Sequence, residues 1–153
     1  MMPVASLEEL EEFLGEKLDQ FERGPPMVHQ GLRLSHVCKQ VQLGILSNNA
    51  SAVRIACRVI TEDPSMPFGK CIKSDFARAL RQRVHLLSRM QRRDLAAKTC
   101  ALLALEFCPR ETEDYCKLIK KFVPSELLPW IAEVRASDEK SRSLLERLIS
   151  EGP

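Results

Sequence analysis

A cluster of arginines is the part of the sequence whose residue types and spacing could best support a chemical function. Between Phe76 and Arg93 the chain has six arginines, one histidine and no carboxylate. If this stretch formed a single helix, five of the basic side chains would share one face: Arg78, Arg81, His85, Arg89 and Arg92. Guanidinium groups bind carboxylates and phosphates through paired hydrogen bonds. The pattern therefore predicts a site for a negatively charged partner.

Two classes of partner carry such charge. An acidic or amphipathic protein segment could lie in a short groove beside the arginines. Nucleic acid could bind the same face through its phosphates. The sequence pI of about 8.2, however, is below the values above 9 typical of nucleic-acid domains, and one Trp and one Tyr leave few rings for base stacking. We therefore predict a protein-interaction module, an adaptor or scaffold, with a nucleic-acid-binding domain as the alternative.

An acidic segment elsewhere in the chain could also neutralise this face internally. The first predicted helix supplies the candidate carboxylates Glu8, Glu9, Glu11, Glu12, Glu16 and Asp19. Surface charges are most often solvated or paired within the fold. Coverage of the arginines by the first helix is thus the main competing interpretation.

No arrangement of residues in the sequence indicates catalysis. Glycine-rich phosphate loops, the Gly-x-Ser-x-Gly elbow and His-Glu-x-x-His are all absent. His85 has no carboxylate within a helical turn that could orient it as a general base. The six cysteines include no Cys-x-x-Cys pair, and we interpret them as reduced thiols, mostly in the core. We expect no enzyme activity, no cofactor and no metal.

Helical periodicity runs through the whole sequence and predicts one all-α domain over residues 1–153. About eight short helices would form a compact bundle or a short armadillo- or HEAT-like stack. Residues 1–23 are expected to include an acidic amphipathic helix capped by Ser6 with Glu9. Residues 63–70 are expected to form an exposed Pro/Gly loop. The other predicted helices are Leu32–Leu46, one after Asn49, Ser74 to about Met90, Leu95–Phe107 after an Asp94 cap, Glu111–Phe122, one after Ser125 and one after Asp138.

A weak internal similarity favours the helical stack. Residues 52–62 and 96–106 align at an offset of 44 residues, within the roughly 40 to 47 residue period of armadillo and HEAT units. Amphipathic helices align easily with one another, so an irregular bundle remains the alternative.

The ends of the chain suggest a second surface and a location. Four apolar residues form a stripe near the C-terminus: Leu144, Leu145, Leu148 and Ile149. This stripe is expected to close the core; the alternatives are a partner's groove or a homodimer contact. Trp130 could anchor a partner or lie in the core.

No apolar run is long enough to span a membrane, and the acidic N-terminal segment is unlike a signal peptide. An intracellular protein, cytoplasmic or nuclear, is expected.

Overall fold

The computed structural model describes residues 4–16, 34–67, 69–122, 134–136 and 138–149. Within these ranges the chain forms α-helices and one 3-10 turn, and no strand occurs among them, which confirms the all-α prediction. The helices are α1 (Leu7–Leu14), α2 (Leu34–Leu46), α3 (Ala50–Glu62), α4 (Gly69–Gln82), the 3-10 turn η2 (Val84–Leu86), α5 (Arg89–Leu103), α6 (Thr112–Ile119) and α8 (Glu139–Ile149).

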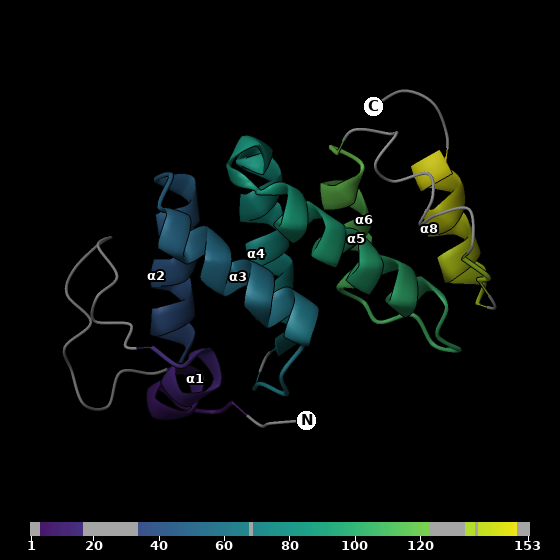
Figure 1. Ribbon diagram of the computed structural model, residues 1–153. Coiled ribbons are helices and arrows are strands. Elements are labelled where there is room, and N and C mark those ends of the chain that lie inside the picture. Colours follow the sequence, from purple (N-terminus) through teal and green to yellow (C-terminus); the bar gives the residue numbers. More distant parts are fainter. Residues whose placement is uncertain (1–3, 17–33, 68, 123–133, 137, 150–153) are drawn as a thin grey trace.

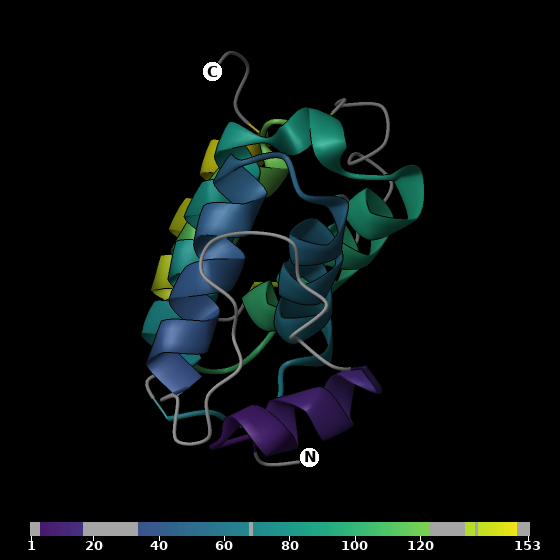
Figure 2. The same cartoon turned by 90° about the vertical axis from the view of Figure 1, so that its left-hand side faces the viewer.

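The helices are arranged in two layers (Figure 1). Helices α2, α4 and α6 pack side by side in one layer, and α3 packs against α5 in the other. Helix α8 packs against α5 and α6 at one end of the molecule. Helix α1 lies at the other end, beside the lower ends of α2 and α3 (Figure 2). The chain turns a corner between α4 and α5. This corner and α1 lie at opposite ends of α3.

One apolar core joins α1 to α6. Val4, Leu10 and Leu14 bring the N-terminal helix into the same buried cluster as α2, α3, α4 and α5. Phe76 in α4 and Tyr115 in α6 are among its largest fully buried side chains. Burying one such side chain contributes roughly 1.5–3 kcal/mol. Because the cluster includes residues on both sides of residues 63–70, that segment does not separate two cores.

Helix α1 begins where the sequence predicts. The Glu9 N–H donates to Ser6 Oγ at 3.1 Å, which is the expected N-cap. The helix ends at Leu14 and is capped by Gly15, whose φ of 73° lies in the left-handed region that favours glycine. It is therefore shorter than the predicted segment 1–23, of which residues 17–23 lie outside the described ranges.

The turn between α2 and α3 also follows the prediction. Asn49 caps α3 by accepting a hydrogen bond from the Ala52 N–H at 3.0 Å. Residues 63–67 then lead into α4, which begins at the buried Gly69. The loop is consequently shorter than the predicted 63–70, and Pro64 within it is buried.

The predicted long helix from Ser74 to about Met90 is wrong. Helix α4 begins before Ser74 and ends at Gln82, and α5 begins only at Arg89. Ser88 starts α5 through a capping box: the Gln91 N–H donates to Ser88 Oγ at 3.1 Å, and the Ser88 N–H donates to Gln91 Oε1 at 2.8 Å. Asp94, the predicted cap, lies in the second turn of α5. The capping box satisfies N–H groups that a continuous helix would have bonded internally.

The side chain of Arg83 holds this break in place. Its Nη2 donates to the Leu46 carbonyl at 2.8 Å, and its Nε donates to Asn48 Oδ1 at 3.0 Å. The Leu46 carbonyl belongs to the last turn of α2 and has no partner within that helix. Arg83 therefore binds the end of α4 to the α2–α3 turn.

The C-terminal helices are close to their predicted ranges. Helix α6 is shorter than the predicted Glu111–Phe122, and α8 follows Asp138 as expected. Leu144 is buried against Leu103 and Cys116, and Leu145 and Leu148 pack partly buried on the same cluster. These residues of the apolar stripe thus close the core. The predicted helix after Ser125 and the side chain of Trp130 lie outside the described residues.

Candidate partner-binding surfaces

The five predicted site residues do not share one helix face. Arg78 and Arg81 belong to α4, His85 belongs to η2, and Arg89 and Arg92 belong to α5. The prediction of one continuous stripe is therefore wrong, because the chain turns a corner between residues 82 and 89. The structure separates the arginines into groups with different surroundings.

Arg78 is directed toward α6. Its Nε and Nη2 donate to the two carboxylate oxygens of Asp114, each at 3.3 Å, and its Nη1 lies 3.6 Å from Asp75 Oδ1. Exposed pairs of this kind contribute little stability. They do occupy the guanidinium group of Arg78, although its side chain remains 61% exposed.

The corner between α4 and α5 brings together three exposed arginines and one exposed histidine. We call this surface the basic corner, and it comprises Arg81, His85, Arg89, Met90 and Arg93. All five are exposed, and the Met90 side chain is 63% accessible. Within the described part of the chain no carboxylate forms an ion pair with its three arginines. Arg92, which was predicted to belong to the same face, is half-buried.

The start of α5 concentrates positive charge further. Its first turn contains Arg89 and Arg92 and no acidic residue. Its capping box uses the amide of Gln91 where a glutamate would have supplied a negative charge. A helix N-terminus already bears a partial positive charge, and each nearby cation opposes it by roughly 0.3–1 kcal/mol. The sequence thus gives up helix stability here and favours an anion.

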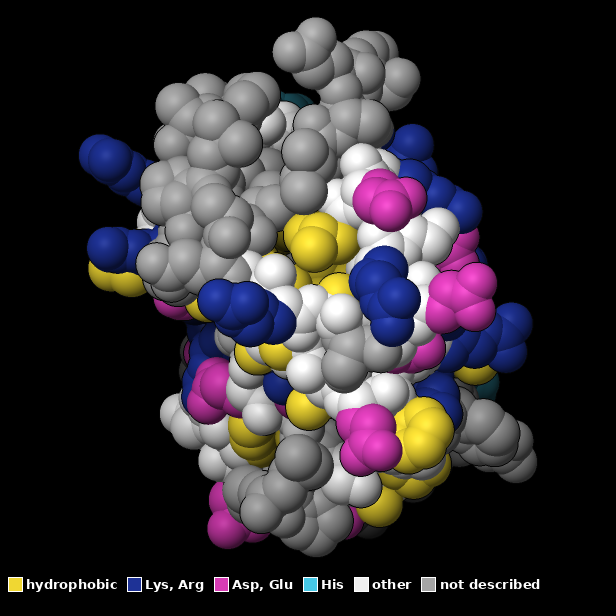
Figure 3. All heavy atoms as spheres, turned by 90° about the vertical axis from the view of Figure 1, so that its right-hand side faces the viewer, with side chains coloured by type: hydrophobic (Ala, Val, Ile, Leu, Met, Phe, Trp, Pro, Cys, Tyr) yellow, Lys and Arg dark blue, Asp and Glu magenta, His cyan; other side chains and the backbone are white. Residues whose placement is uncertain are grey.

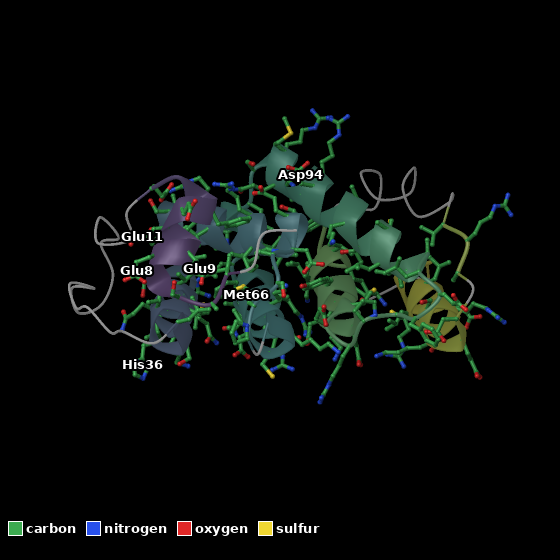
Figure 4. The ribbon with its side chains drawn as sticks, turned by 90° about the horizontal axis from the view of Figure 1, so that it is seen from below. Glu8, Glu9, Glu11, His36, Met66 and Asp94 are labelled. Atoms are coloured by element: carbon green, nitrogen blue, oxygen red, sulfur yellow. The ribbon has the colours of Figure 1, made fainter. Side chains whose placement is uncertain are left out.

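The described part of the acidic first helix, residues 4–16, lies away from this surface. Glu16 instead pairs with Arg54 of α3, where Arg54 Nη2 donates to Glu16 Oε1 at 2.8 Å. This hydrogen bond lowers the pKa of Glu16 below its usual value. Arg58 of α3 donates to the Leu14 carbonyl at 2.8 Å. In Figure 4 the labelled carboxylates of α1 lie well apart from Asp94 on α5.

The far end of the molecule has a different character. On the face that includes α8, Lys and Arg side chains alternate with Asp and Glu side chains around a small apolar patch (Figure 3). Arg147 of α8, for example, lies 3.8 Å from Glu113 of α6. Charges of both signs are mixed here, whereas the basic corner has one predominant sign.

A polar groove between α4 and α6 was not predicted. Its volume is about 860 Å³, and most of its lining side chains are charged. Lys73 is almost fully buried there: its Nζ donates to Asp63 Oδ1 and to the Pro64 carbonyl, each at 2.7 Å. Asp63 also lies 3.1 Å from Lys98 Nζ. Burial raises the pKa of Asp63, but the hydrogen bonds from both lysines outweigh burial and hold it below its usual value.

Glu111 lines the same groove immediately before α6. The residue is only 7% exposed, and its Oε2 has no hydrogen-bond partner. A buried carboxylate oxygen without a donor is costly and uncommon. In the sequence a glutamate at this position resembles an ordinary favourable charge at a helix N-terminus, so no local signal distinguished it.

Most of the cysteines are free thiols in the core, as predicted. Four are buried: Cys38, Cys57, Cys100 and Cys116. Burial raises the pKa of Cys38 to about 12 and makes the largest contribution to similar values for Cys57 and Cys116. Cys71 is exposed on α4. Within the ranges given above, no group of three or more His, Cys, Asp or Glu side chains is placed to hold a metal ion.

The length and apolar character of the helices were compared with what a membrane span requires. None of the described helices combines the length and apolar character that a bilayer span requires.

No protein-family model, curated protein or solved structure matches this chain.

Proposed function

We propose that this protein is a non-enzymatic interaction module that binds an acidic or amphipathic segment of another protein through the basic corner. The observation that carries the proposal is the set of three exposed arginines of the basic corner, Arg81 at the end of α4 and Arg89 and Arg93 in α5, without an internal carboxylate partner among the described residues. Arg89, in the first turn of α5, opposes the helix dipole. A carboxylate-bearing partner relieves this repulsion and accepts hydrogen bonds from the guanidinium groups.

The exposed Met90 favours a protein partner over nucleic acid. Its flexible, polarizable side chain is exposed and belongs to the same first turn of α5 as Arg89. A segment that alternates acidic and apolar residues can place a carboxylate on each arginine and an apolar side chain on Met90. Nucleic acid would use the arginines alone, and the interleaved charges of the α8 face provide no extended positive track.

The layered packing supports a scaffold of the helical-repeat kind. The two segments that align at an offset of 44 residues belong largely to α3 and α5, which pack together in the same layer. Alternation of helices between layers is the arrangement of armadillo and HEAT stacks. The six free thiols support an intracellular location, where thiols are kept reduced.

The charge-reversing variant Arg81→Glu/Arg89→Glu tests the proposed site. Its affinity for a fluorescent peptide of repeated Glu-Glu-Leu units should fall about tenfold or more, because two charge-assisted hydrogen bonds are replaced by repulsion. Fluorescence anisotropy measures the affinity, and circular dichroism checks that helicity is retained. Lys39→Glu/Lys140→Glu is the matched control, since it makes the same charge change at exposed positions of α2 and α8.

Binding of duplex and single-stranded oligonucleotides tests the alternative that the basic corner binds nucleic acid. They are titrated in parallel at about 50 and about 200 mM salt. Equal binding of the acidic peptide by the double variant and the native protein would contradict the proposal. Tighter binding of oligonucleotide than of peptide at the higher salt would establish the nucleic-acid alternative instead.

A further inference from the structure

Arg89 and Arg93 form a pair of like charges on the exposed side of α5. They are four positions apart, so their side chains differ in direction by about 40° around the helix, and their Cβ atoms lie roughly 5–6 Å apart. Like charges at this spacing destabilise a helix. Both side chains are exposed, and neither has a carboxylate partner in the described part of the chain. No internal contact described here offsets the repulsion between them.

Asp94 is the carboxylate nearest to this pair in the sequence, and it does not neutralise the pair. Its direction differs from that of Arg89 by about 140° around α5. Burial, and after it the charge of Asp94, raises the pKa of Cys57 in α3, so the Asp94 carboxylate acts toward α3. Among the described residues, Asp94 forms no ion pair with an arginine.

The anionic side chains that a protein partner can present differ in charge and in geometry. The carboxylate of Asp or Glu has one negative charge and two acceptor oxygens, and a single guanidinium group can occupy both oxygens. The phosphate of a phosphorylated Ser or Thr has a charge of about −1.5 to −2 at pH 7 and three acceptor oxygens. One phosphate can therefore accept hydrogen bonds from two guanidinium groups and offset both of their charges.

We propose that the basic corner binds a phosphorylated serine or threonine within an acidic segment of a partner protein, with the phosphate between Arg89 and Arg93. The inference rests on the proposed function and specifies the partner of that same site. Arg81 at the end of α4 and His85 in η2 are exposed and available to carboxylates that flank the phosphorylated residue. Met90, in the first turn of α5, is available to an apolar residue of the same segment.

Three forms of one peptide test this inference. They share the sequence Glu-Glu-Leu on each side of a variable position, which is phosphoserine, glutamate or serine, and each carries the same fluorophore. Fluorescence anisotropy with the full chain measures their affinities at about 150 mM salt, where exposed charges more than about 8 Å apart are largely screened. The phosphoserine peptide should bind about tenfold or more tightly than the glutamate peptide, and the serine peptide should bind most weakly.

Arg93→Gln gives the second readout, because it removes one guanidinium group of the pair and leaves the α5 capping box intact. The ratio of phosphoserine to glutamate affinity should fall to about threefold or less, since the remaining guanidinium group can be occupied by a carboxylate. Arg135→Gln makes the same change at an exposed position outside the basic corner and should leave the ratio at about tenfold or more. Circular dichroism checks that both variants retain their helicity.

The outcomes separate this inference from the function on which it rests. Equal affinity for the phosphoserine and glutamate peptides would overturn the inference and leave the proposed function standing. Absence of binding by all three peptides would overturn both. A ratio that is unchanged in Arg93→Gln would show that the phosphate does not lie at this pair. Tighter binding of a single-stranded oligonucleotide than of the phosphoserine peptide at the same salt would assign the site to nucleic-acid phosphates instead.

Discussion

Cys71 lies on the surface of α4, whereas Cys38, Cys57 and Cys116 lie inside the core. Only the thiolate form of cysteine reacts readily, and the pKa of each of these three buried thiols is raised to about 12. At pH 8 iodoacetamide should therefore modify Cys71 first, and the three buried thiols only after unfolding. Peptide mass spectrometry at successive times measures the order. Early modification of Cys57 in the native protein would contradict this assignment of burial.

The same raised pKa values make stability depend on pH. An unfolded cysteine ionises near its ordinary pKa of about 8.5, so above that pH the unfolded state loses protons that the folded state retains. The free energy of unfolding should fall as the pH rises from about 8.5 toward 12. Urea midpoints at pH 7 and pH 10 measure the fall, and Cys38→Ala should reduce it. If the urea midpoint fell as much between pH 7 and pH 10 in Cys38→Ala as in the native protein, this result would contradict the contribution of the Cys38 thiol.

The arginines show why individual roles were not predictable from the sequence. Arg78, Arg81 and Arg83 are three positions or fewer from their neighbours, yet Arg78 pairs with α6, Arg81 stays exposed and Arg83 binds the α2–α3 turn. The acceptors of Arg78 and Arg83 are 36 and 37 residues away in sequence. Helical spacing reports which side chains share a face, but not what that face meets.

Helix ends were predictable where a local signal agreed with the apolar pattern. Ser6 with Glu9 and the Asn49 cap are both confirmed. The Ser88-x-x-Gln91 capping box is an equally local signal, yet the apolar spacing through Val84 and Leu87 suggested that the helix continued across it. Tertiary hydrogen bonds from Arg83 accompany the break between the helices, and no local pattern contains them.

The amide in the α5 capping box allows stability and binding to be separated. Gln91→Glu should retain the hydrogen bond to the Ser88 N–H and add a favourable charge at the helix N-terminus, stabilising the protein by about 0.3–1 kcal/mol. The new carboxylate should also weaken binding of the Glu-Glu-Leu peptide. Ser88→Ala, in contrast, should destabilise by about 0.5–2 kcal/mol. Urea unfolding and anisotropy measure the two effects; a more stable Gln91→Glu protein with undiminished peptide affinity would contradict the site.

The shared core predicts that the described helices unfold together. Leu10 of α1 is 1% exposed and belongs to the same buried cluster as α3 and α4. Leu10→Ala should therefore lower the free energy of unfolding by about 2–5 kcal/mol and still give one cooperative transition. Circular dichroism and intrinsic fluorescence should follow the same urea curve. A separate early transition in the variant would instead identify α1 as an independent unit.

The fold class followed from helical periodicity, but the groove between α4 and α6 did not. Lys73, Asp63 and Glu111 come from three segments, and their proximity exists only after α3, α4 and α6 have packed. Buried charges resemble surface charges in a sequence, because burial depends on neighbours distant along the chain. The basic corner was predicted in part: Arg81, His85 and Arg89 were among the predicted site residues, whereas Met90 and Arg93 were not.

Among the described residues, the placement of α1 and the basic corner at opposite ends of α3 separates negative from positive charge, which the small net charge conceals. Glu8 and Glu12 are exposed near one end, and Arg81, Arg89 and Arg93 are exposed near the other. A molecule with this charge separation turns in the field of a charged partner before contact, and such steering raises association rates by about 10- to 1,000-fold at low ionic strength. Under the proposed function, the protein should approach an acidic target with the basic corner foremost and α1 trailing.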